Sequence, residues 1–178
     1  MMRKSAIAVI LLLALTALAA AQAPKVVTGQ LVLDANAVHA GSKAKAAVVA
    51  EIAPGYHIND HVPSLDYLIP TELKLEPSAP LTIGATEYPK GSPQKFSFLD
   101  TPISVYQGKL VVGAELDVAS AARPGTYTLK GSLNYQACND RACLPPTSLP
   151  LTLSVKVVPR SQAVKPANTD VFHGLKFN

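Results

Sequence analysis

Apolar and polar residues alternate with a period of two along most of this chain. The even positions are apolar from 43 to 52 and again from 109 to 118, and most of the residues between them are polar or charged. Two further runs, 126–137 and 149–157, place Tyr, Leu and Val at their odd positions. Successive side chains of a β-strand point to opposite faces, so this pattern predicts strands with one buried and one solvated face.

Shorter runs at 27–33, 68–76 and 81–88 give weaker strand patterns, separated by Pro and Gly. About seven or eight short strands with turn residues between them predict an all-β fold, an antiparallel immunoglobulin-like β-sandwich, with a small barrel as the alternative. The chain has no Trp, and its two Cys lie too close in sequence to bridge two sheets, so the core of an antibody domain is absent.

The chain begins with the features of a secretory signal peptide at residues 1–21. Arg3 and Lys4 precede an apolar run of about 16 residues that ends in small residues, which fits cleavage after Ala21 and is short for a membrane span. We therefore expect a periplasmic or secreted protein with one β-sandwich domain at 22–158. The alternation stops at Val158, and residues 159–178 are expected to form a polar tail.

Charge and length narrow the classes of function. Removal of Arg3 and Lys4 lowers the formal net charge from +4 to +2, which is too small to indicate nucleic acid or an anionic membrane as a partner. The remaining chain of about 157 residues is long enough to bury a core without a covalent staple.

Both cysteines, Cys138 and Cys143, lie in one loop between two strands that are expected to pair. In an oxidising compartment they form a disulfide unless something reduces them. An inert structural bridge is one interpretation, but a loop of about six residues contributes only roughly 2 kcal/mol. Exchange with another thiol is the second interpretation. Zinc is disfavoured because two Cys make half a site, and we expect neither a metal nor another cofactor.

Three further features are candidates for chemistry. Arg141, between the cysteines, either favours a thiolate by its charge or is a solvated loop tip. His57 could transfer protons near neutral pH, whereas the prolines around it argue against a helical His57/His61 metal site. The loop at 93–102 carries Phe96 and Phe98, one of which either packs into the core or covers a reactive group.

Three motifs occur in order along a part of the chain that extends over about residues 25–158. They are Pro54–Asn59 with Leu68–Leu73, then Tyr88–Gly91 running to Val105–Gly108, and then Tyr135–Cys138 running to Cys143–Pro146. In this order and spacing the chain resembles the amino-terminal periplasmic domain of the thiol:disulfide interchange protein DsbD. The resemblance implies an immunoglobulin-like fold, in agreement with the strand pattern.

The resemblance also implies a function. Cys138 and Cys143 would take electrons from a thioredoxin-like domain or a membrane thiol reductase and pass them to oxidised periplasmic proteins. His57, Asn59 and Tyr135 would line the cysteine site. The loop at 93–102 would cap the site, with Phe96 or Phe98 as the shielding residue.

Full-length DsbD continues into a multi-span membrane domain and a terminal thioredoxin-like domain, and this sequence contains neither. The resemblance therefore implies either a separate membrane reductase as the electron donor or another use of the domain. The rival hypothesis is a secreted β-sandwich used for binding or structure, with an inert disulfide. Cys138 ends a strand and Cys143 follows a polar tip, so we expect Cys138 to be buried and Cys143 to be exposed and to react first.

Overall fold

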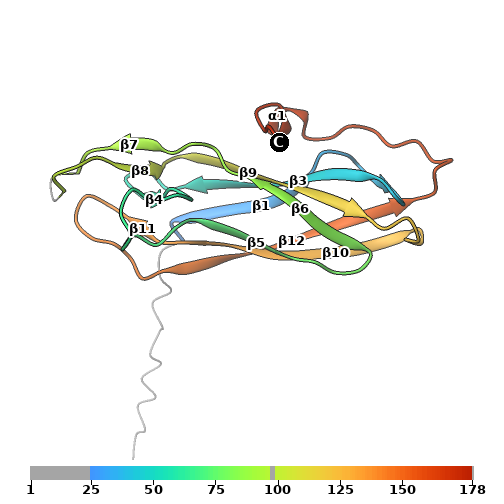
Figure 1. Cartoon of the computed structure of the whole chain (residues 1–178), viewed down its shortest axis with the longest axis horizontal. Coiled ribbons are helices and arrows are strands. Elements are labelled where there is room, and N and C mark those ends of the chain that lie inside the picture. Colours follow the sequence, from blue (N-terminus) through green and yellow to red (C-terminus); the bar gives the residue numbers. More distant parts are fainter. Residues whose placement is uncertain (1–24, 97–98, 178) are drawn as a thin grey trace, which may run out of the picture.

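The computed structural model describes residues 25–96 and 99–177. The expected signal peptide and Phe98 therefore lie outside the described residues. Two antiparallel sheets pack face to face as a sandwich, and a third, smaller sheet extends one end of it (Figure 1). The predicted all-β, immunoglobulin-like sandwich is confirmed, and the sheets do not close into a barrel.

The first sheet has the strand order β1-β3-β9-β6, and all of its neighbouring strands are antiparallel. Its strands are β1 (Val27–Leu33), β3 (Lys43–Ile52), β9 (Lys109–Val118) and β6 (Leu81–Glu87). The second sheet has the order β2-β12-β10-β5, in which only the short β2 runs parallel to its neighbour. Its strands are β2 (Val38–His39), β12 (Thr147–Val158), β10 (Gly125–Tyr135) and β5 (Glu72–Glu76).

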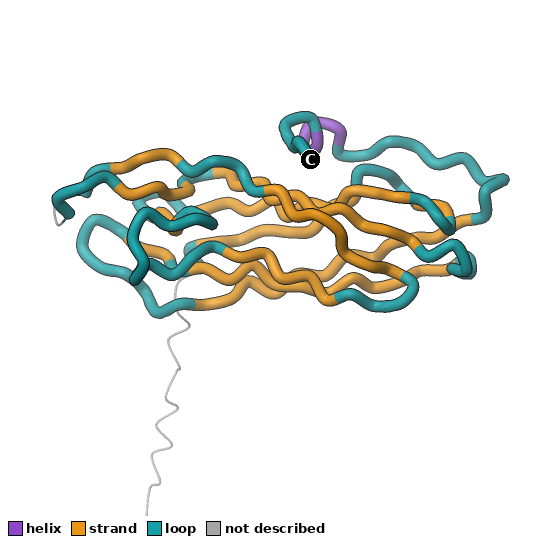
Figure 2. Tube along the Cα trace, viewed as in Figure 1, coloured by secondary structure: helices purple, strands orange, loops and turns teal. Residues whose placement is uncertain are grey.

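The third sheet lies at the left end of the molecule in Figure 1 and has the order β11-β4-β8-β7. Its strands are β11 (Ala137–Cys138), β4 (His57–Asn59), β8 (Ile103–Tyr106) and β7 (Ser92–Gln94). Figure 2 shows that much of the loop structure gathers at the two ends of the sandwich, beyond the long strands. The cysteine loop lies at the end that carries the third sheet.

The core follows from the alternation in the sequence. The even positions of β3 and β9 are buried, and they face the buried odd positions of β10 and β12 across the sandwich. The fully buried set includes Val48, Leu110, Leu129, Leu133 and Val155. Burial of one such side chain contributes about 1.5–3 kcal/mol, so this interior holds the two sheets together.

Residues 159–177, which we call the C-terminal segment, return along the sandwich after β12. The backbone N–H of Ala167 donates to the carbonyl of Asp34 at 2.8 Å, and the Asn168 side-chain amide donates to the carbonyl of Leu33 at 2.8 Å. The sequence pattern indicated only a polar tail here and did not predict these contacts with the start of the domain.

The end of the C-terminal segment lies on the outer face of the first sheet. It contains the short helix α1 (Thr169–Phe172), which Figure 1 shows beside β3 and β9. A Cβ at Gly113 of β9 would lie 2.6 Å from side-chain atoms of both Leu175 and Phe177. The Lys45 ammonium lies 4.8 Å from the centre of the Phe177 ring. The absence of a side chain at Gly113 thus makes room for this segment.

Over the described residues, no helix has the length and apolar character that a membrane crossing requires.

Candidate functional site

Cys138 and Cys143 are joined by a disulfide with an S–S distance of 1.99 Å and a Cα–Cα distance of 3.9 Å. Cys138 is 3% exposed, whereas Cys143 is exposed, as the sequence predicted. One sulfur therefore belongs to a buried residue at a strand end, and the other belongs to a residue that is exposed to solvent.

The loop between the cysteines is held by local hydrogen bonds around Asn139. Its side-chain oxygen accepts from the backbone N–H groups of Arg141 and Ala142, both at 2.9 Å. Its own N–H donates to the carbonyl of Ala142 at 3.0 Å. Arg141 is exposed at the tip, and it forms no ion pair with any described residue. The loop therefore has contacts of its own that do not depend on the disulfide.

The exit from the loop is fixed to the strand that leads into it. The N–H of Leu144 donates to the carbonyl of Ala137 at 2.8 Å, and the Gln136 side chain donates to the carbonyl of Leu144 at 3.2 Å. Pro145 and Pro146 follow and stiffen the chain, because proline fixes φ and lacks an N–H. Cys143 thus lies between two anchored stretches of backbone.

Strand β4 places two of the predicted site residues beside Cys138. In the ladder between β11 and β4, Cys138 is paired with His57, and Ala137 is paired with Ile58. Directly paired residues point to the same face of a sheet. His57 therefore shares a face with Cys138, and so does Asn59 two residues further on. Ile58 points the other way, into the core.

Phe96 lies on this same face. Its ring stacks on the ring of His57 with the centroids 4.3 Å apart and the planes at 28°. The loop that carries Phe96 connects β7 to β8, so its two ends are fixed in the third sheet. Phe96 thus stacks on His57, the residue paired with Cys138, which is where a cap over the cysteine site is expected.

Burial sets the charge states of two predicted site residues. His57 is 3% exposed, and burial lowers its pKa below the ordinary value of 6.5, so its imidazole is neutral at pH 7. Burial raises the pKa of Tyr135, so its hydroxyl stays protonated. Near Cys138 the protein therefore holds a neutral base.

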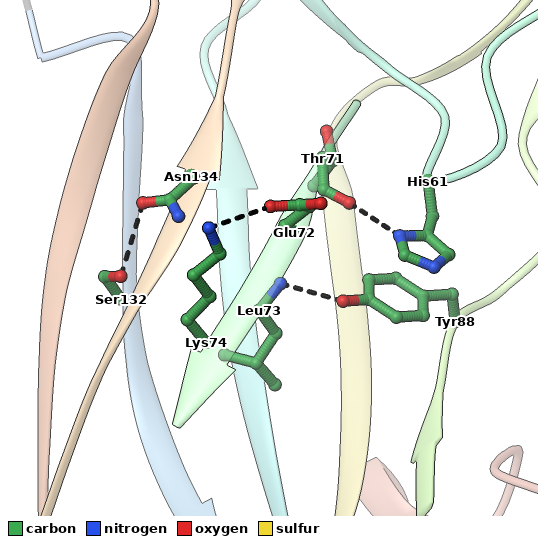
Figure 3. Close-up of polar contacts among 8 residues, drawn as sticks. All are labelled: His61, Thr71, Glu72, Leu73, Lys74, Tyr88, Ser132 and Asn134. Atoms are coloured by element: carbon green, nitrogen blue, oxygen red, sulfur yellow. Dashed lines mark hydrogen bonds and ion pairs between the residues drawn. The ribbon is translucent and has the colours of Figure 1, made fainter. Parts of the chain in front are cut away.

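The Asn59 and His61 side chains make contacts with residues other than the cysteines. The Asn59 amide donates to the carbonyl of Ile69 at 2.8 Å, while its buried side-chain oxygen has no hydrogen-bond partner among the described residues. His61 stacks on Tyr88 with ring centroids 3.6 Å apart, and its Nδ1 lies 3.0 Å from the carbonyl of Thr71 (Figure 3). His57 and His61 thus make separate contacts, and the described residues contain no group of three or more metal-ligating side chains.

A buried carboxylate that the sequence did not single out lies directly after β4. Asp60 is 8% exposed and accepts hydrogen bonds from the hydroxyls of Ser104 and Tyr106, both at 2.6 Å. It also accepts from the N–H groups of Gly91 at 3.0 Å and Val62 at 3.3 Å. No Lys or Arg of the described residues forms an ion pair with it.

Three of these hydrogen bonds, from Gly91, Ser104 and Tyr106, connect the residue after β4 to the β7–β8 hairpin, and the bond from Val62 is local. Burial acts to raise the pKa of Asp60, but the hydrogen bonds lower it by more, so the group is ionised at neutral pH. A Cβ at Gly91 would lie 2.6 Å from the Asp60 carboxylate, so only glycine fits there. Because β7 begins at Ser92, Asp60 fixes the base of the hairpin that carries Phe96.

The chain matches one known family, and it is similar to solved structures at low sequence identity. Residues 24–154 match the family described as "Thiol:disulfide interchange protein DsbD, N-terminal". The chain is similar to the amino-terminal domain of Neisseria meningitidis DsbD in the reduced form, with 19% identity, a TM-score of 0.47, and coverage of 82% of this chain and 94% of that one. It is also similar to the amino-terminal periplasmic domain of ScsB from Proteus mirabilis, with 18% identity, a TM-score of 0.46, and coverage of 71% and 44%. No match was found among the curated proteins.

Proposed function

This chain belongs to the family of the amino-terminal domain of the thiol:disulfide interchange protein DsbD, and from that premise we propose that it is a periplasmic thiol–disulfide exchange module. The observation that carries the proposal is the Cys138–Cys143 disulfide, in which a buried and an exposed residue are joined within one short loop. Such a bond can be opened from the surface and closed again while the two sheets stay packed.

The first half of the cycle reduces the pair. A thiolate of the donor attacks the sulfur of Cys143, forms a donor–Cys143 disulfide, and releases Cys138 as a thiolate. The second thiolate of the donor then attacks the donor sulfur in that bond, which releases Cys143 and leaves the donor oxidised. Two electrons, with two protons, pass from the donor dithiol to this protein.

The second half oxidises the pair again. The Cys143 thiolate attacks the disulfide of an oxidised client protein, forms a client–Cys143 disulfide, and releases one client thiolate. Cys138 then attacks the Cys143 sulfur, which re-forms the internal disulfide and releases the second client thiolate. The client gains the two electrons and the two protons.

Neighbouring residues support these steps. His57 is neutral and shares a face with Cys138, so it is suited to accept a proton from that thiol and to return it. Phe96 stacks on His57 and limits access to this face until a partner binds. Arg141 lies two residues before Cys143, and its positive charge favours the thiolate of Cys143.

We propose a thioredoxin-like domain or a membrane thiol reductase as the donor, and oxidised periplasmic proteins as the clients. Membership of the family supports this assignment and the periplasmic location. The competing function is a secreted structural or binding module with an inert disulfide.

Reduction of the native protein distinguishes the two functions. Low millimolar dithiothreitol is added to the oxidised protein, thiols are counted by mass after alkylation, and near-ultraviolet circular dichroism reports the fold. We expect rapid reduction with the fold retained, because the loop keeps its Asn139 hydrogen bonds and loses only roughly 2 kcal/mol of loop-closure stabilisation. A reduction rate that equals the global unfolding rate would instead show an inert bridge.

A further inference from the structure

We propose that Asn59 is a positioning residue of the exchange reaction, and that its side-chain oxygen accepts a hydrogen bond from the Cys138 thiol once the disulfide is reduced. This inference rests on the proposed function and deepens it. It gives the buried thiol a defined partner during the part of the cycle in which Cys143 exchanges with another protein.

The side-chain oxygen of Asn59 is a buried acceptor without a donor. Asn59 is 1% exposed, and this oxygen is the only buried side-chain nitrogen or oxygen of the described residues that has no hydrogen-bond partner. Buried polar groups are nearly always hydrogen-bonded, because an unpaired one keeps the cost of its desolvation. The unpaired oxygen therefore indicates a donor that the oxidised protein does not supply.

The rest of Asn59 is held in place by hydrogen bonds. Its side-chain NH₂ group donates to the carbonyl of Ile69 at 2.8 Å, and its backbone carbonyl accepts from the buried Thr71 hydroxyl at 2.6 Å. A rotation of the amide would replace the bond to Ile69 with an unfavourable contact between two oxygens. The side-chain oxygen therefore keeps its orientation and cannot find another donor by turning.

The neighbours of Asn59 in the third sheet indicate which donor is missing. Asn59 is paired with Val105, which is apolar, and His57 precedes it by two residues on the same face. The His57 ring makes no hydrogen bond to the Asn59 oxygen. Cys138, which is paired with His57, is the diagonal neighbour of Asn59 on this face. Diagonal neighbours lie about 7–8 Å apart, with their Cβ atoms somewhat closer, a gap that two side chains directed toward each other can bridge.

The redox state of Cys138 accounts for the unpaired oxygen. In the disulfide the Cys138 sulfur carries no proton, so it cannot donate a hydrogen bond. Reduction by a partner dithiol transfers two electrons and two protons, and one of these protons stays on the Cys138 sulfur. The resulting S–H group is a weak donor. The reduced protein thus gains a hydrogen bond that the oxidised protein lacks.

The consequence is a division of labour between the two sulfurs. An amide oxygen stabilises a neutral thiol and not a thiolate, because it is an acceptor. Cys138 therefore stays protonated while the Cys143 thiolate attacks the client. Cys138 must then release its proton, to His57 or to water, before it attacks the Cys143 sulfur and closes the disulfide again.

The direct test is the infrared S–H stretching band of Cys138. The substitution Cys143→Ala leaves Cys138 as the only thiol of the chain, and a hydrogen bond moves the band of a thiol to lower frequency. We expect the band to move to higher frequency when Asn59→Leu is added, because Leu has a similar shape and no acceptor. Thr71→Val is the matched control, since it removes the other bond that anchors Asn59 and keeps the side-chain oxygen. It should leave the band in place.

A second readout is the redox equilibrium of the native cysteine pair in mixtures of reduced and oxidised dithiothreitol. We expect Asn59→Leu to shift this equilibrium about fivefold toward the disulfide, because only the reduced form loses a hydrogen bond to the side-chain oxygen. This shift corresponds to about 1 kcal/mol, the usual contribution of one hydrogen bond. Thr71→Val should leave the equilibrium unchanged, because the bond that it removes is present in both redox states.

An S–H band that is unchanged by Asn59→Leu would overturn the proposal. An equal shift of the band in Thr71→Val would also overturn it, because the effect would then come from the anchoring of the loop. If Asn59→Leu does not fold, the side-chain carbonyl ¹³C resonance of Asn59 in the native sequence decides. It should move on reduction, and an unchanged resonance would overturn the hydrogen bond. Failure of the exchange function gives a different result, since the native disulfide would then be reduced only as fast as the protein unfolds.

Discussion

Removal of the Phe96 ring should make the reduced cysteine pair more accessible. Phe96 is half-buried and stacks on His57, which is paired with Cys138 in the ladder between β11 and β4. The substitution Phe96→Ala removes this contact and leaves the backbone of the hairpin in place. The hairpin keeps its base, because that base is held by Asp60 and not by the ring.

The size of the effect follows from the stacking contact. An aromatic pair contributes about 0.5–1.5 kcal/mol beyond the area that it buries. In the closed form Phe96 stacks on His57, and in the open form it has moved away. If loss of the stacking contact destabilises the closed form by about 1 kcal/mol, the population of the open form rises about fivefold. The loss in global stability should remain below the about 3–5 kcal/mol that is typical of a deleted core Phe, because Phe96 is only half-buried.

The assay is the rate at which iodoacetamide alkylates the reduced protein, followed by mass spectrometry. We expect the rate to rise about fivefold in Phe96→Ala. Phe177→Ala is the matched control, since Phe177 is also half-buried but packs against Gly113 on the outer face of the first sheet. An unchanged rate in Phe96→Ala, or an equal rise in both variants, would refute the reasoning that the stacked ring shields the cysteines.

Three further predictions concern the supporting structure. Asp60→Asn replaces one carboxylate oxygen, which accepts hydrogen bonds, with an NH₂ group, which donates them, although all four neighbouring groups are donors. It should therefore destabilise the protein by about 1.5–3 kcal/mol in urea titrations. The pKa of Asp60 is lowered in the folded protein, so its ionised form stabilises the fold. This stabilisation is complete above pH about 3.9, the usual pKa of an unfolded Asp, and it is lost as the pH falls through the folded pKa. The free energy of unfolding of the native protein should therefore fall more steeply with acid than that of Asp60→Asn. Gly113→Val should displace the C-terminal segment and expose residues 159–177 to limited proteolysis, and an unchanged cleavage pattern would contradict the packing. Asn139→Ala should destabilise the reduced protein more than the oxidised protein in urea titrations, because in the oxidised protein the disulfide still closes the loop. Equal losses in the two forms would contradict the role of Asn139 in holding the loop.

The sequence predicted the long strands well because their period is unambiguous. In β3 and β9 the even positions form the core, as the alternation indicated. The strand expected at 68–76 begins only at Glu72, because the preceding residues form a loop that is fixed by Asn59. The Asn59 amide binds the carbonyl of Ile69, and the Thr71 hydroxyl donates to the carbonyl of Asn59 at 2.6 Å. Hydrogen bonds of this kind, between side chains and distant backbone groups, do not appear in the pattern of apolar and polar residues along the sequence.

The sequence did contain a signal for the packing of the C-terminal segment, in the odd positions of β3 and β9. Ala47, Val49, Val111 and Gly113 are small or apolar residues at the odd positions of β3 and β9, on the face expected to be solvated. Ala47 is fully buried. An apolar outer face predicts a covering element, and the amphipathic end of the chain supplies it.

The Asp60 network could not be predicted from local pattern. Its donors come from residues 62, 91, 104 and 106, which the fold alone brings together. An aspartate directly after a short strand, and a glycine directly before another strand, were the only local signals. By contrast, the positions of Cys138, Cys143 and His57 were predictable, because the cysteine loop is local and the family motifs span it.

The central claim is that Cys143 exchanges with the partner and that Cys138 resolves the bond. The most direct test uses two single variants, Cys138→Ser and Cys143→Ser. Each is incubated with a thioredoxin-like domain that lacks its own resolving cysteine and is activated as a mixed disulfide with a small aromatic thiol. We expect Cys138→Ser to form a stable covalent complex through Cys143, and Cys143→Ser to form little, because Cys138 is buried. The reverse pattern would contradict the assignment of the two sulfurs, and no complex from either variant would contradict the exchange function.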